Sequence, residues 1–122
     1  MKRISIIALC LLAPAWANAA FYDTAYLGRL LGSCDALPET FEATAENFER
    51  IKDCGLSTGY ILSVYDTLHV MADRSLCLPS SLAAEQAVAV VDTWIRNHPE
   101  RAGNPAEESV RSALQAAWSC PN

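Results

Sequence analysis

Beyond residue 20, apolar residues recur every three or four positions along most of the chain, which is the spacing of one face of an α-helix. No stretch alternates apolar and polar residues around an Asn-Gly or Asp-Gly turn, the pattern typical of a β-hairpin. The sequence therefore predicts an all-α fold, a small helical bundle of about four helices. The expected helices run from about Tyr22 to Leu31, Thr40 to Met71, Pro79 to Pro99, and Pro105 to Trp118.

Punctuating residues mark the expected helix ends. Gly32 is suited to stop the first helix, a serine within Pro79–Ser81 to cap the third, and Pro99 to end it. The clearest start signal is Asn104–Glu107, with asparagine as cap, proline at the first helical position and glutamate three residues after the cap. Short loops between four helices favour antiparallel neighbours, so we expect an up-and-down bundle or a near relative.

The first residues have the three parts of an export signal. Lys2 and Arg3 precede an apolar stretch from Ile4 to Ala13, and Ala17–Ala19 has the small-x-small pattern of a cleavage site. The apolar run of about ten residues is shorter than the roughly 20 that span a bilayer, and no later segment is apolar enough to span one. We expect residues 1–19 to be a signal peptide and 20–122 a single soluble domain in the periplasm.

Of five cysteines, Cys10 lies in the expected signal, which leaves Cys34, Cys54, Cys77 and Cys120. An even number in a small exported domain predicts two disulfides, and the absence of C-x-x-C argues against a zinc knuckle or a redox pair. Four cysteines allow three pairings. In an up-and-down layout the start of the third helix and the end of the fourth share a pole, which favours Cys77–Cys120 and leaves Cys34 for Cys54.

Acidic residues outnumber basic ones, with a formal net charge of −5 that becomes −7 without Lys2 and Arg3. The negative net charge disfavours nucleic acid and anionic membranes as partners and favours a basic protein. On the second helix, Glu49 and Asp53 belong to a stripe of like charges whose repulsion folding alone does not explain. The stripe is either a solvated face or a face that meets a basic partner.

The chain offers little material for catalysis or metal binding. His69 and His98 stand far apart, and no phosphate-binding glycine loop, zinc-protease motif or nucleophile elbow occurs. Asp66 and His69 share a helix face, which is typical of a surface pair and less often of a ligand pair. We predict a protein without enzymatic activity, cofactor or metal.

The segment between the last two helices is the strongest candidate for partner binding. It is polar, carries both charge signs, and contains His98, Pro99, Glu100, Arg101 and Asn104. Its simplest interpretation is a surface turn, but loops held between rigid helices are also where binding residues concentrate.

An ordered set of residues, together with the signal peptide and the first helix, resembles the Rap/Tai family of type VI secretion amidase immunity proteins. The set comprises Cys54-Gly55, Gly59-Tyr60-Ile61, Asp66, Cys77-Leu78-Pro79, Gln86, Val90-Val91, His98-Pro99-Glu100, Ala113-Leu114 and Cys120.

The resemblance implies an all-helical, periplasmic and usually dimeric protein that binds a cognate peptidoglycan amidase effector and blocks its active site. It also implies that a segment of this chain fills the amidase cleft, for which the loop from His98 to Asn104 is our candidate. The alternative is a periplasmic stress protein or chaperone-like binder, since small acidic disulfide-bonded helical domains also serve that role.

Overall fold

The computed structural model describes residues 20–40, 42–71 and 75–121 and consists of packed helices joined by loops. This part of the chain contains no strand, which confirms the predicted all-α class. The helices are α1 (Thr24–Asp35), α2 (Ala45–Val70), α3 (Ala84–Asn97), the short 3₁₀-helix η2 (Pro99–Arg101) and α4 (Ala106–Trp118).

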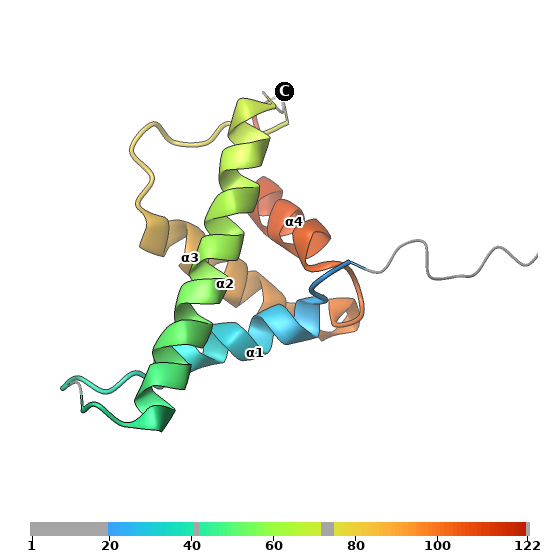
Figure 1. The fold of residues 1–122 in the computed structure, drawn as a ribbon. Coiled ribbons are helices and arrows are strands. Elements are labelled where there is room, and N and C mark those ends of the chain that lie inside the picture. Colours follow the sequence, from blue (N-terminus) through green and yellow to red (C-terminus); the bar gives the residue numbers. More distant parts are fainter. Residues whose placement is uncertain (1–19, 41, 72–74, 122) are drawn as a thin grey trace, which may run out of the picture.

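The helices cross one another instead of running strictly up and down (Figure 1). With 26 residues, α2 is about twice as long as any other helix, so α1 and α3 pack across its length. At Gly28 the two shorter helices come close, since a Cβ there would lie 3.3 Å from Cγ2 of Ile95. Glycine therefore allows α1 and α3 to approach.

One apolar core joins all four helices, and its members are Leu27, Leu31, Ile61, Val64, Leu68, Val91, Ala106, Val110, Ala113 and Leu114. In α2 these residues begin only at Ile61. The first turns of that helix extend beyond the core, and Phe48 and Ile51 there are 57% and 42% exposed. The C-terminal half of α2 thus joins the core, whereas its first turns lie outside the core and are tied to α1 through Cys54.

Three helix ends differ from the sequence expectation. α1 continues past Gly32 to Asp35, and α2 begins at Ala45, where the Thr44 hydroxyl accepts a hydrogen bond from the backbone N–H of Asn47 at 3.2 Å. α3 begins at Ala84 and not at a serine cap, because the Gln86 side chain accepts from the N–H of Ala83 at 3.1 Å.

The predicted cap of α4 is also wrong. Pro105 occupies the cap position and makes no side-chain capping bond, and the Asn104 amide instead donates to Glu108 Oε2 at 3.2 Å. The Asn104 carbonyl accepts a bond from α1, so this residue joins two helices and does not start one.

Two disulfides connect the helices in the pairing favoured by the sequence. Cys34–Cys54 ties the end of α1 to α2, and Cys77–Cys120 ties the segment before α3 to the end of α4. Around the second bond, Cys77 N–H donates to Trp118 O at 2.8 Å and Cys120 N–H to Ser75 O at 3.2 Å. The first bond therefore joins two helices, and the second fixes the irregular segments before α3 and after α4.

Across the described ranges, no helix combines the length and the apolar character needed to cross a membrane.

Candidate functional site

The segment between α3 and α4 has an ordered backbone. Residues Pro99–Arg101 form the single turn η2, in which Arg101 N–H donates to His98 O at 3.0 Å and Ala102 N–H to Pro99 O at 3.2 Å. Asn104 N–H closes the next turn on Arg101 O at 2.9 Å. These successive turns hold the loop in one shape.

Hydrogen bonds to the start of α1 anchor the loop. Ala102 O and Asn104 O accept from the backbone N–H groups of Ala25 and Thr24, at 3.0 and 2.9 Å. The Thr24 hydroxyl also donates to Asn104 O at 3.0 Å and lies 2.6 Å from the Ser109 hydroxyl. Because the Thr24 proton is used on Asn104, the Ser109 hydroxyl is the donor to Thr24. Both hydroxyls are buried, so this chain of bonds is shielded from water.

An aromatic stack fixes the other end of the loop. The His98 ring lies on the Trp94 ring, with centroids 4.0 Å apart and planes 15° from parallel. His98 Nδ1 is 2.7 Å from the Trp94 carbonyl, which can only accept, so Nδ1 carries a proton. His98 is therefore a rigid, half-buried support, and its Nε2 is the ring atom left to contact a partner.

The tip of the loop faces solvent. Pro99, Glu100 and Arg101 are exposed, and neither charged side chain forms a hydrogen bond or an ion pair within the described part of the chain. A fixed backbone thus presents a carboxylate and a guanidinium side by side, a combination suited to recognise a polar protein surface.

The acidic candidates Glu49 and Asp53 lie elsewhere. They flank Lys52 on the first half of α2, where Lys52 Nζ contacts Glu49 and is 4.0 Å from Asp53. The hydrogen bond to Glu49 raises the pKa of Lys52. This lysine offsets part of the negative charge that seemed unexplained in the sequence.

The structure does not bring the two groups of candidate residues together. Arg50 Nη1 donates to Ala36 O at 3.1 Å, which places the acidic residues at the C-terminal end of α1. The loop is bonded to the N-terminal end of α1, and this helix of 12 residues is about 18 Å long. The loop and the acidic face are therefore separate candidate sites (Figure 1).

Sequence reasoning missed the residues that hold the loop. Thr24 precedes the apolar stripe of α1 and Ser109 lies within a helical stretch, so nothing in their spacing links them to the loop. Trp94 differs, because it stands four residues before His98, a spacing at which two side chains can meet on a helix face. The role of Thr24 and Ser109 follows from tertiary contacts, since the Thr24–Asn104 and Thr24–Ser109 bonds join residues 80 and 85 positions apart.

We predict that Thr24→Val lowers the free energy of unfolding by about 1–3 kcal/mol, because the buried Ser109 hydroxyl loses its acceptor. Adding Ser109→Ala should recover part of that loss, since the unsatisfied hydroxyl is then removed. Thr67→Val is the matched control, because Thr67 is exposed and bonds only within α2. Urea unfolding measures all four chains, and equal values for Thr24→Val and Thr67→Val would contradict the assignment.

Asp66 and His69 are both exposed on α2. His69 stacks on Tyr65 with ring centroids 6.4 Å apart. In the parts of the chain that the structure describes, no three His, Cys, Asp or Glu side chains are grouped to hold a metal ion.

Comparison with known proteins supplies the family. The family model of the Rap1a immunity proteins matches residues 26–120, from the first helix to the last cysteine. A search of curated proteins finds no match. The family match covers most of the chain and confirms the resemblance seen in the sequence. The chain therefore belongs to the family of Rap1a immunity proteins, which are non-catalytic inhibitors and not enzymes.

Proposed function

We propose that this protein is a periplasmic immunity protein that binds and inhibits a type VI secretion peptidoglycan amidase effector. The observation that carries the proposal is the loop from His98 to Asn104, which has a fixed backbone and an exposed charged tip. The family match supports an immunity role, and the target is the part that we add.

A rigid protruding loop suits an inhibitor that enters a cleft. Binding a flexible segment costs about 0.5–1.5 kcal/mol for each rotamer-rich side chain that becomes ordered, and more for mobile backbone. Here the turn η2, the bonds to Thr24 and Ala25, and the His98–Trp94 stack order the backbone before any partner arrives. The contacts of Glu100 and Arg101 at the interface therefore do not have to offset the free-energy cost of ordering the loop backbone.

We also propose export, with residues 1–19 as the cleaved signal and residues 20–122 as the periplasmic domain. Two disulfides support this location, since such bonds persist in oxidising compartments. A homodimer is a further part of the proposal. The apolar side chains of Phe48 and Ile51, which stand three residues apart on α2 and are 57% and 42% exposed, support a contact with a second copy.

The decisive experiment titrates a candidate amidase effector with the oxidised chain 20–122 and measures cleavage of purified peptidoglycan. We expect inhibition at one chain per amidase. Exchanging two charges, as in Glu100→Arg with Arg101→Glu, keeps the net charge and should weaken inhibition by about 100-fold, as loss of a central contact does. The same exchange at Glu49 and Lys52 tests the acidic face, and we expect a change below about ten-fold.

The outcomes separate the two sites and the two functions. A larger loss from the exchange at Glu49 and Lys52 than from the exchange at Glu100 and Arg101 would move the interface to α2. An amidase that stays active with excess oxidised chain contradicts the proposed inhibition. Binding of many unrelated unfolded proteins in acid, with exposed apolar surface, would instead favour the chaperone-like alternative.

A further inference from the structure

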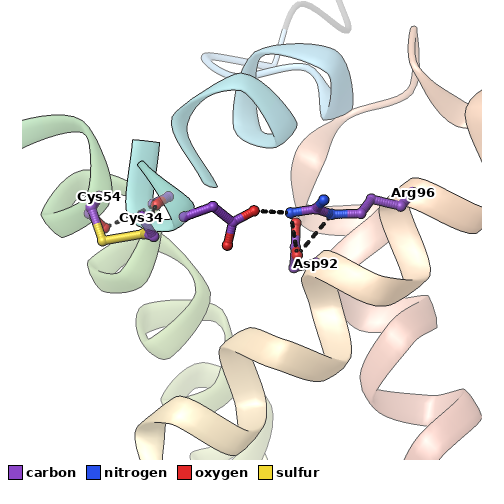
Figure 2. Close-up of polar contacts among 6 residues, drawn as sticks. Cys34, Cys54, Asp92 and Arg96 are labelled. Atoms are coloured by element: carbon purple, nitrogen blue, oxygen red, sulfur yellow. Dashed lines mark hydrogen bonds and ion pairs between the residues drawn. A yellow bond between two sulfur atoms is a disulfide. The ribbon is translucent and has the colours of Figure 1, made fainter. Parts of the chain in front are cut away.

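A groove lies between the end of α1, the middle of α2 and the first turns of α3. Its volume is about 410 Å³, and apolar or small side chains form much of its wall, among them Leu31, Thr58, Val88 and Ala89. The Cys34–Cys54 disulfide forms part of the wall and fixes α1 to α2 there (Figure 2). The groove is distinct from the loop at the other end of α1.

Carboxylates line this groove as well. Asp35 ends α1, while Glu85 and Asp92 stand two turns apart on one face of α3. Both aspartates contact the guanidinium of Arg96, which donates to Asp92 Oδ2 from Nε at 2.9 Å (Figure 2). Two of these three carboxylates share one guanidinium, so the groove keeps an excess of negative charge.

Arg96 shows which ligand chemistry this rim accepts. Its guanidinium lies between carboxylates from two helices, so the spacing of Asp35 and Asp92 already fits a planar cation. Glu85 lies two turns of α3 away from Asp92, is exposed, and forms no ion pair within the described residues. This carboxylate is available to a second cation, and Val88 and Ala89 lie next to it for an aliphatic chain.

We propose that this groove binds an arginine or lysine, flanked by aliphatic residues, on an exposed segment of a partner protein. The charged head would pair with Glu85 at the rim, and the aliphatic stem and neighbours would cover Val88, Ala89 and Thr58. Charge complementarity selects this occupant, since the groove joins an apolar wall to unbalanced carboxylates. The inference does not depend on the partner being an amidase.

The test uses the oxidised chain 20–122 and the peptide acetyl-Leu-Arg-Leu-amide, followed by amide NMR. We expect concentration-dependent shifts at Thr58, Glu85 and Ala89, and weaker binding of the same peptide with citrulline, which is nearly isosteric and uncharged. Glu85→Gln should raise Kd for the arginine peptide about three-fold, the size typical of an exposed ion pair, and leave Kd for the citrulline peptide unchanged.

Two further variants complete the design. Asp66→Asn removes the same charge from an exposed site on α2 about 12 Å beyond Thr58 and should leave Kd unchanged. Ala89→Trp fills the groove and should abolish the shifts at Thr58, with thermal unfolding as the check on folding. Equal affinity for both peptides, shifts that avoid the groove, or equal effects of Glu85→Gln and Asp66→Asn would overturn the proposal.

Discussion

Replacing Cys77 and Cys120 together by serine should lower the free energy of unfolding by about 4 kcal/mol. The bond joins residues 43 positions apart, and in the chain-entropy model its loss frees a large loop in the unfolded state. The folded state suffers too, because the segment around Cys77 is not helical and is held to α4 by the disulfide and a few backbone bonds. The total free energy of unfolding of a domain of this size is only about 5–15 kcal/mol.

Urea unfolding of the oxidised wild-type and double-serine chains measures this difference. The matched pair is Cys34→Ser with Cys54→Ser, which opens a loop of 20 positions and should cost about 3 kcal/mol. A loss below about 1 kcal/mol for the Cys77 and Cys120 pair would show that the backbone bonds alone hold the end of α4. Under conditions in which the double-serine variant at Cys77 and Cys120 stays folded, it should still inhibit, since the loop lies at the other end of α4.

Leu27→Ala should lower the free energy of unfolding by about 3–5 kcal/mol. Leu27 is fully buried in the core shared by all four helices, and truncation removes its apolar contacts and leaves a cavity. The residue stands one turn after Thr24, so the cavity opens below the bonds that hold the loop. We therefore expect weaker inhibition as well as lower stability.

Leu56→Ala is the control for this change, because it deletes the same atoms from a helical leucine that is 44% exposed. Its effect should stay within about 1 kcal/mol. Thermal unfolding of the two variants side by side checks the contrast. Similar losses of stability for Leu27→Ala and Leu56→Ala would mean that the core relaxes around residue 27 and that burial there does not control stability.

Helical periodicity predicted the number of helices because each one buries a continuous apolar stripe. Leu27 and Leu31 of α1, or Val110 and Leu114 of α4, follow this spacing, and all four are buried. Periodicity did not predict where helices end. Gly32 is compatible with a helix, and since Cys34 of the next turn is bonded to Cys54, tertiary structure extends α1 past a residue that often stops helices.

The candidate loop was located correctly as a turn between the last two helices, because Pro99 and Gly103 interrupt the helical pattern. Its rigidity could not be predicted, since it depends on Thr24 and Ser109, which are far from the loop or hidden in a helical stripe. The prediction that Asn104 caps α4 was wrong for the same reason. Asn104 has a good local capping signal, but its carbonyl accepts a hydrogen bond from Thr24 of the distant helix α1.

The bond between the Tyr22 carbonyl and the Ala106 N–H, at 3.0 Å, has a practical consequence for attaching the protein to a surface. It holds the start of the domain beside the loop, whereas Cys120 is fixed at the far end of α4, about 20 Å away along a helix of 13 residues. An affinity tag placed after Pro121 therefore leaves the loop facing solution. A tag placed just ahead of Tyr22 holds the loop close to the surface. The protein attached through that tag would therefore bind its partner poorly on a sensor chip, and the protein attached through the tag after Pro121 would bind it well.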